Sequence, residues 1–253
     1  MLFRSLGRLA PVHISGLPMM AEVTSTYHLP EPPPAVAWYK GLFRTWGMGG
    51  NDRFGDCVFA GAAHFEMLVS KLAGRPIDPT TEQILHEYAL ATGFDPRDPS
   101  TDNGAVESQI LRRWKEVGMF GRTIDGFIGI NPESQTQLKD AVWLFGASLL
   151  GIELPVSAQS QQVWDVPLGG PKGDGAPNSW GPHCTLLVGA GRRGVTMITW
   201  GQEKQATWEF MRTYCEEAYA ILSPDWIIEK TQSSPGGVPL ASLHRDLRAI
   251  RMA

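Results

Sequence analysis

Cysteine is scarce in this chain, with 3 residues among 253. So small and odd a number argues against a disulfide framework and favours a reducing compartment. Basic residues are not in excess either: Lys and Arg number 22 and Asp and Glu 26, which gives a formal net charge of −4. No stretch reaches the roughly 18 consecutive apolar residues that a membrane-spanning helix needs. We therefore expect neither a nucleic-acid nor a membrane partner.

Glycine and proline, by contrast, are plentiful, at 28 and 19 residues. With 43% hydrophobic residues, they indicate a loop-rich globular protein that can bury a sizeable core. Residues 1–36 end in the proline-rich run LPEPPPAV, which predicts an extended arm lying on or leaving the domain. Small and polar residues interrupt any apolar core near the N-terminus, so we expect no signal peptide and a cytoplasmic protein.

Helical periodicity dominates the first half of the chain. The first convincing helix starts at GDC, where Asp56 is a suitable N-cap, and Gly74 stops it. The small residues in its early turns, 60–63, would let another backbone come close. Three further segments have apolar residues spaced three and four apart, which predicts helices over 81–92, 105–117 and 134–145.

Strand patterns follow. The apolar run 147–155 predicts a strand, and 183–201 predicts a hairpin around a GRRG turn. A short helix over 207–217, a strand over 218–223 and an amphipathic C-terminal helix complete the pattern. Helices before strands indicate the α+β class. The long loop 156–182, between the first strand and the hairpin, is expected to form a lid or the wall of a site.

Cys57 is the cysteine with an activating position. It falls in the first turn of its predicted helix, where the helix dipole and unpaired N–H groups favour a thiolate. The Gly-rich approach GMGGNDRFGDC would leave the sulfur accessible, and the amide of Asn51, six residues earlier, could donate to an oxyanion near it. Cys184 and Cys215 are expected to be packing residues, Cys215 on the late helix.

A thiolate nucleophile needs a base, normally a histidine that the fold brings close. Of six histidines, His183 is the best placed, because it begins an apolar strand directly after the long loop. A metal site built from Cys57, His183 and Cys184 is disfavoured, since neighbouring strand residues point to opposite faces. We expect no metal and no cofactor.

These segments together resemble the papain-like cysteine peptidases. GDCVFAGAAHFEML is similar to that family's nucleophile helix, and TDNGAVESQILRRWKEVG to its Asn-Gly-Gly substrate wall with the following helix. LKDAVWLFGASLLGIELP is similar to the helix and strand before the catalytic His. HCTLLVGAGRRGVTMITWG is similar to the strand pair that begins at that His and ends at Asn-Ser-Trp-Gly. The matches occur in order over residues 47–222. The pattern NDxxGDC…HC…TWG more narrowly resembles papain-like proteins of bacteria and their phages.

The resemblance implies a two-lobed fold with a cleft between the lobes. A papain-like domain would cover 37–230, with a helical lobe over about 47–130 and a sheet lobe over about 131–230, followed by a tail at 231–253. In it, Cys57 is the nucleophile, His183 the base and Asn51 an oxyanion donor. Asn103 and Gly104 would line the substrate wall, and Trp200 would shield His183.

One position departs from the family pattern. The asparagine that orients the catalytic histidine should fall at Ile198 or Thr199, and neither is an amide. The Thr199 hydroxyl could take its place, with Gln202 as a further candidate, but a hydroxyl restrains the imidazole less well than an amide carbonyl does. The family's structural disulfides are also missing, as expected of an intracellular variant.

Two functions follow from these residues. The first is a thiol-dependent hydrolase of peptide or amide bonds. The alternative is a papain-like binding or assembly module with little turnover, for example a phage structural or accessory protein, whose N-terminal arm or C-terminal helix docks a protein partner. The missing Asn favours the module, and the set of Cys57, His183 and Asn51 favours the enzyme. The corresponding locations are cytoplasmic or phage-associated.

Overall fold

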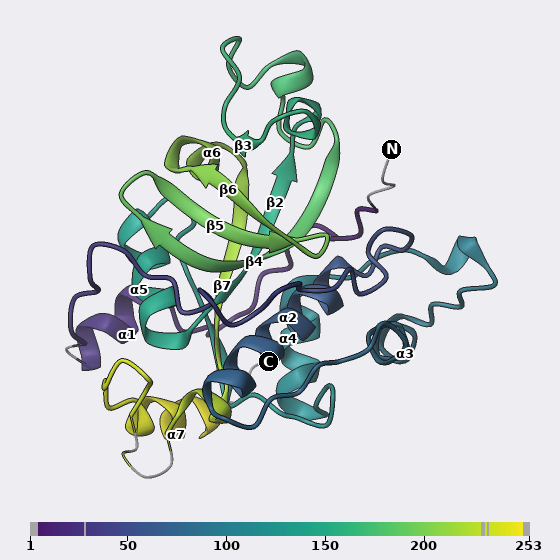
Figure 1. The fold of residues 1–253 in the computed structure, drawn as a ribbon. Helices are drawn as coiled ribbons and strands as arrows, with labels where there is room; N and C mark the ends of the chain where they lie inside the picture. Colours follow the sequence, from purple (N-terminus) through teal and green to yellow (C-terminus); the bar gives the residue numbers. More distant parts are fainter. Residues whose placement is uncertain (1–4, 28, 229–230, 232, 250–253) are drawn as a thin grey trace.

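The computed structural model describes residues 5–27, 29–228, 231 and 233–249. They form a twisted sheet with helices grouped beside it, so that the sheet occupies the upper part of Figure 1 and helices α2, α3 and α4 the lower right. The mixed composition and the segregation of helices from strands confirm the α+β class.

Seven strands form one sheet in the order β1-β7-β2-β4-β5-β6-β3. All neighbours are antiparallel except β3 and β6, which are parallel. The strands are β1 (Gly126–Gly129), β2 (Ser148–Leu154), β3 (Val163–Trp164), β4 (Gly181–Gly191), β5 (Gly194–Thr199), β6 (Gln202–Thr207) and β7 (Cys215–Leu222).

Of the helices, one lies in the N-terminal arm, and the others lie beside the sheet. They are α1 (Met20–Tyr27), α2 (Cys57–Leu72), α3 (Thr81–Thr92), α4 (Glu107–Glu116), α5 (Gln135–Phe145), α6 (Trp208–Tyr214) and α7 (Ala241–Ala249). Their ends follow local chemistry: Thr80 forms a capping box with Gln83 at the start of α3, and left-handed Gly93 ends that helix.

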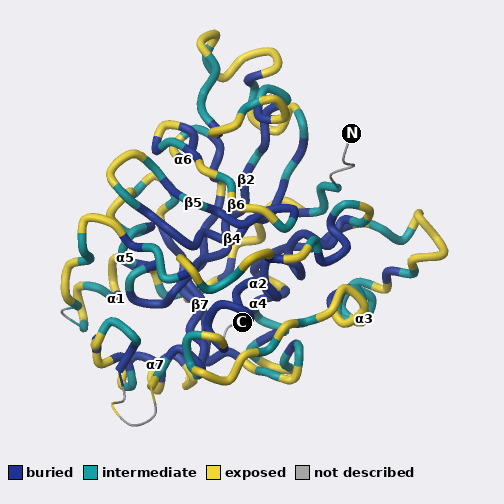
Figure 2. The backbone as a smooth tube through the Cα atoms, viewed as in Figure 1, coloured by how far each residue is buried: buried dark blue, intermediate teal, exposed yellow. Residues whose placement is uncertain are grey.

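Helix α2 is the central helix, buried from Cys57 to Ser70 (Figure 2). It packs on β4, and a Cβ added at Gly61 would come within 2.8 Å of the Leu149 Cδ2 atom. The small residues of 60–63 therefore permit the close approach that the sequence predicts. Asp56 occupies the N-cap position, but its side chain makes no capping hydrogen bond, which corrects the expectation that it caps the helix.

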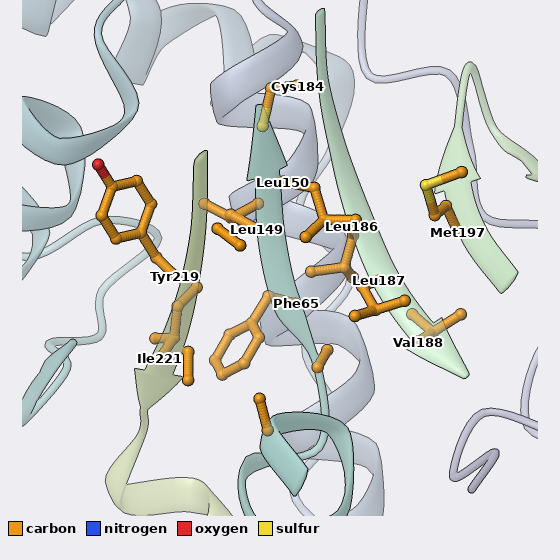
Figure 3. Packing of buried hydrophobic residues seen from close by; sticks show 14 of the residues in the cluster. Phe65, Leu149, Leu150, Cys184, Leu186, Leu187, Val188, Met197, Tyr219 and Ile221 are labelled. Carbon is orange, nitrogen blue, oxygen red and sulfur yellow. The ribbon is translucent and has the colours of Figure 1, made fainter. Parts of the chain in front are cut away.

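The hydrophobic core lies between α2, α5 and the middle strands. Figure 3 shows buried side chains of β2, β4 and β7, including Leu149, Leu186 and Ile221, with Phe65 of α2 in the same cluster. Because β2 and β4 are covered on both faces, their sequences are nearly continuously apolar rather than alternating.

Several elements differ from the sequence-based expectation. The late helix ends at Tyr214, because Cys215 already pairs with Ile152 of β2; Cys215 is therefore a strand residue. Strands β1 and β6 have too few apolar residues in alternation to be recognised beforehand. β1 lies within the range expected for the helical lobe, yet it pairs with β7 and belongs to the sheet. The loop 156–182 contains two 3-10 turns and β3.

The N-terminal arm lies on the domain and is not wholly extended, since it contains α1. It makes single bridges to three parts of the fold: Arg8 with Ala105, Met19 with Gly129, and Val36 with Ala190. The last of these joins the proline-rich run to the edge of the β4–β5 hairpin. The arm therefore crosses from the helical layer to the sheet as it runs along the chain.

The C-terminal helix α7 docks beside β1, at the lower left of Figure 1. Leu243 and Leu247 are buried, as their spacing predicts, whereas Ile250 lies outside the described residues. Asp125, just before β1, accepts hydrogen bonds from His244 at 2.6 Å and from Arg248 at 2.9 Å. These bonds hold the pKa of Asp125 below its usual value against the effect of burial, which raises it.

Replacing Gly61 by leucine should separate α2 from the sheet. We expect Gly61→Leu to lower the free energy of unfolding by about 1–3 kcal/mol, because the added side chain must displace Leu149. Chemical denaturation followed by circular dichroism measures the change. Glu82→Leu, at an exposed position of α3, is the control and should change stability little. Equal stability of the two variants would contradict the close packing.

Candidate active site

Cys57 is the first residue of α2, and its sulfur lies against the start of β4. The Cys184 backbone N–H donates to Cys57 Sγ, with a nitrogen–sulfur distance of 3.4 Å. This contact joins the N-terminus of the helix to the strand residue that follows His183. The fold thus brings together Cys57 and His183, which are 126 positions apart in the sequence.

His183 is fully buried, and Thr199 and Trp200 both contact its ring. His183 Nε2 and the Thr199 Oγ1 atom are 2.8 Å apart. The indole of Trp200 stacks on the imidazole with ring centroids 4.2 Å apart and an angle of 10° between the planes. Thr199, the residue expected to orient the histidine, is therefore in hydrogen-bond contact with it. Gln202, the alternative, is exposed and lies opposite Thr199 on β6.

A two-residue turn places Trp200 over the histidine. Trp200 and Gly201 connect β5 to β6 and have φ values of 46° and 69°. Two positive φ values are typical of the type I′ hairpin turn. Glycine adopts a positive φ without strain, whereas tryptophan does so only at a cost in free energy. A Cβ at Gly201 would also come within 2.7 Å of the Gly47 carbonyl oxygen. Gly201 therefore serves the turn and the close approach of the 47–50 loop.

Asn51 lies in a turn immediately before α2 and is buried. Its side-chain Nδ2 donates to the Phe54 carbonyl at 3.2 Å, and its backbone carbonyl accepts from the Ser5 N–H at 3.1 Å. The amide therefore stabilises the 51–54 turn in this structure. The same amide hydrogen-bonds the Asp56 side chain and so opposes the rise that burial causes in the pKa of Asp56.

Gly104 and Asn103 precede α4 and differ in their surroundings. Asn103 is exposed and donates to the Ser100 carbonyl at 3.2 Å. The Gly104 N–H donates to the Tyr88 hydroxyl oxygen at 2.8 Å, and its φ of 73° suits glycine. The next residue, Ala105, contributes the main-chain groups that bind an extended segment, a role that the sequence analysis did not assign to it.

That extended segment is residues 5–9, hereafter the arm segment, and it covers the sulfur. The Ala105 N–H donates to the Gly7 carbonyl at 2.8 Å, and the Leu9 N–H donates to the Ala105 carbonyl at 2.9 Å. The Trp200 indole N–H donates to the Ser5 carbonyl at 3.2 Å. The arm segment therefore contacts both sides of the site, from Trp200 on the sheet to Ala105 beside α4.

The arm segment changes the chemistry of the thiol. Cys57 is 1% exposed, and burial raises its pKa to about 12, although hydrogen bonds from the backbones of Cys184 and Gly7 oppose this shift. The accessible, acidic thiol that the sequence predicts is therefore not present while the arm segment is seated. The Gly7 backbone contacts the sulfur, and its carbonyl oxygen is bound to Ala105.

Steric fit restricts the residue at position 7. A Cβ added to Gly7 would lie 1.9 Å from the Gly55 carbonyl oxygen, and one added to Gly104 would lie 2.0 Å from the Gly7 oxygen. Only paired glycines permit this approach. The sequence signal for this close approach is Gly7 itself, and a single glycine does not identify the segment that it packs against.

The described part of the chain gives no support for a metal centre or a membrane span. Within residues 5–27, 29–228, 231 and 233–249, no three His, Cys, Asp or Glu side chains gather so as to hold a metal ion. Among the same residues, no helix combines the length and the hydrophobicity that crossing a bilayer requires.

Comparison with known proteins places the fold. No protein-family model matches the sequence, and no curated protein matches it either. Solved structures do match. Xylellain, a cysteine protease from Xylella fastidiosa, aligns with a TM-score of 0.65 at 12% identity, over 87% of this chain and 97% of that one.

Two further structures agree. Digestive procathepsin L 3 of Tenebrio molitor gives a TM-score of 0.54 at 13% identity, covering 87% of this chain and 76% of the other. A Carica candamarcensis cysteine protease in complex with E-64 gives 0.51 at 12% identity, covering 76% and 99%. Cys57 and His183 thus stand in a chain that has the fold of the papain-like cysteine proteases.

Proposed function

We propose that the chain is a thiol-dependent hydrolase that cleaves a peptide or amide bond. The observation that supports it most is the junction of α2 with β4, where Cys57 Sγ accepts the Cys184 N–H next to His183. A nucleophile at a helix N-terminus and a histidine oriented by a third group are the arrangement that thiol catalysis needs.

The residues divide the reaction between them. His183 Nε2 is paired with Thr199, which assigns the proton exchange with the Cys57 thiol to Nδ1. The thiolate attacks the substrate carbonyl carbon, and the carbon–nitrogen bond breaks as His183 returns the proton to the leaving amine. Water then hydrolyses the thioester, with the same imidazole as base. The Cys57 N–H and the side-chain amide of Asn51, which would have to turn from Phe54 or Asp56, are the proposed oxyanion donors.

Substrate would take the place of the arm segment. Ala105 offers one N–H and one carbonyl to an extended chain, and both are now bonded to the arm segment. Gly104 leaves room for such a chain, and Trp200 keeps water from the His183–Thr199 pair. The hydrolase therefore works only after the arm segment has left the site, and the full chain is self-inhibited.

The alternative is a binding or assembly module without turnover. The burial of Cys57 favours it. So does the hydroxyl of Thr199, which stands where the papain-like pattern has an asparagine amide. In that case, displacement of the arm segment would expose a docking groove with an ordinary thiol in it. The reactivity of the thiol distinguishes the two functions.

Expelling the arm segment should activate Cys57. We expect Gly7→Val to prevent seating, because its side chain would clash with the Gly55 backbone. Alkylation of Cys57 by iodoacetamide should then be fast, with a plateau extending below about pH 7, as in a thiolate–imidazolium pair. In the unchanged chain, a thiol with a pKa of about 12 should react slowly. Peptide mapping by mass spectrometry identifies the alkylated cysteine.

Two further variants complete this test. Gly169→Val, where an added Cβ meets no atom within 4 Å, should leave the slow alkylation unchanged. Gly7→Val combined with His183→Ala should lose the plateau. If Gly7→Val reacts only as an ordinary thiol, near a pKa of about 8.5, the hydrolase proposal is wrong.

Thr199 should act through its hydroxyl. In the Gly7→Val chain, Thr199→Val keeps the shape but removes the bond to His183 Nε2, so we expect the alkylation plateau to shift toward higher pH. Any peptide hydrolysis should fall by about 10- to 100-fold, the equivalent of one hydrogen bond to a charged group. Thr199→Ser should behave like threonine, and Thr199→Asn should act at least as well. An unaltered pH profile in Thr199→Val would exclude the orienting role.

A further inference from the structure

Beside the arm segment lies a buried pocket that holds the side chain of Arg8. That side chain is 1% exposed, although arginine is rarely buried. Its Nη1 donates to Glu217 Oε1 at 2.7 Å, and its Nη2 donates to Glu216 Oε2 at 2.5 Å. Glu107 of α4 is fully buried nearby and is the strongest of the charges that stabilise the arginine cation. We call the site of Glu107, Glu216 and Glu217 the acidic pocket.

The acidic pocket gathers three carboxyl groups around the single Arg8 guanidinium. Among the described residues, no nitrogen or oxygen donor hydrogen-bonds the carboxyl oxygens of Glu107, and the Cys184 side chain is its hydrogen-bond partner. Burial, and then the charge of Glu217, raise the pKa of Glu107. Burial also raises the pKa of Glu217, although the Tyr219 hydroxyl donates to it at 2.7 Å. A cation is therefore the ligand that these side chains lack when Arg8 is absent.

The pocket is also shaped for a long side chain. A Cβ at Gly151 of β2 would lie 2.5 Å from Glu217 Cγ and 2.9 Å from Arg8 Cδ. The missing side chain at Gly151 thus leaves the space that the arginine stem fills. Since the Arg8 guanidinium contacts two different carboxylates, the pocket recognises the planar fork and not only the charge.

The main chain positions this side chain relative to the nucleophile. Ala105 hydrogen-bonds the residues on both sides of Arg8, Gly7 and Leu9. Gly7 contacts Cys57 Sγ, so the pocket lies one residue from the reactive atom along an extended chain. An extended peptide that pairs with Ala105 in the same parallel sense would direct the side chain between its two bonded residues toward the same place.

We infer that the acidic pocket is the specificity site of the enzyme and selects peptide substrates with an arginine side chain, whose place Arg8 takes in the resting chain. The inference rests on the proposed function for the cleavage step, but the recognition itself does not require turnover. An apolar side chain would leave Glu107 and Glu217 buried without a cation, whereas an arginine replaces both of the bonds that Arg8 gives up.

Binding to an inactivated, arm-released chain tests the inference. The protein is the full chain with Gly7→Val and Cys57→Ser, and the probes are two fluorescently labelled acetyl-tetrapeptide amides that differ only in one arginine or norleucine. By fluorescence anisotropy, we expect the arginine peptide to bind about 10- to 100-fold more tightly, since two charge-assisted hydrogen bonds are at stake. Adding Glu217→Gln should remove most of this preference. Equal affinities, tighter binding of norleucine, or no binding of either peptide would overturn the inference.

This result can be separated from that of the hydrolase proposal. Selective binding of arginine by the Cys57→Ser chain, together with an unreactive Cys57 in the Gly7→Val chain, would retain the pocket and reject the enzyme. A reactive Cys57 with no preference for arginine would do the reverse.

A second measurement covers the case in which the arm-released chain does not fold. In the otherwise unchanged chain, Arg8→Met keeps the stem and removes the two ion pairs, so the arm segment should open more often and Cys57 should be alkylated about 10-fold faster or more. Arg8→Lys should fall between arginine and methionine. If Arg8→Met and the unchanged chain are alkylated at the same rate, the acidic pocket does not hold the arginine, and the inference fails.

Discussion

The contact between the N-terminus of α2 and the beginning of β4 is the constraint on which the site depends. The Cys184 N–H reaches the Cys57 sulfur because α2 packs on β4, and the absence of a side chain at Gly61 leaves room for Leu149 in that packing. A larger residue there would move the Cys57 sulfur away from His183 without touching either residue. The small residues of 60–63 therefore contribute to the geometry of the proposed active site as well as to the core, since packed interiors transmit such displacements.

The imidazole is held by means other than the usual amide. Thr199 supplies one hydrogen bond, while Trp200 covers the ring at nearly parallel orientation. The stacking is possible because the Trp200–Gly201 turn accepts a positive φ at a bulky residue, which the following glycine and the tight hairpin stabilise. Thr199 is buried, so its hydroxyl oxygen can accept from His183 Nε2–H in place of an amide carbonyl.

Much of this was predictable from the sequence, because the signals are local. Thr80, Gly93 and the apolar spacing of 134–145 define helices on their own, and the alternation around the GRRG turn defines the hairpin. The pairing of Cys57 with His183 was accessible through order along the chain. Strand β1 was not, since its four residues are recognisable only by their pairing with β7. The course of the arm segment was also inaccessible, because its bonds to Ala105 join backbones and leave no trace in side-chain chemistry.

The acidic pocket was equally inaccessible from the sequence, and it links the proposed self-inhibition to the proposed selectivity for arginine. Arg8, Glu107 and Glu217 lie far apart in the sequence, and each looks like an ordinary surface charge until the fold buries them in one place. Because the arm is covalently attached, its effective concentration at the site is on the order of millimolar, so even modest bonds keep it seated. To displace the arm segment, a substrate must compete with this effective concentration, and it does so by making the same contacts. If the inhibitor used Ala105 alone, any extended peptide would compete equally well; the ion pairs of Arg8 raise the threshold for all peptides except those that bring a guanidinium of their own. The pocket that strengthens inhibition is therefore the one that defines which peptides relieve it.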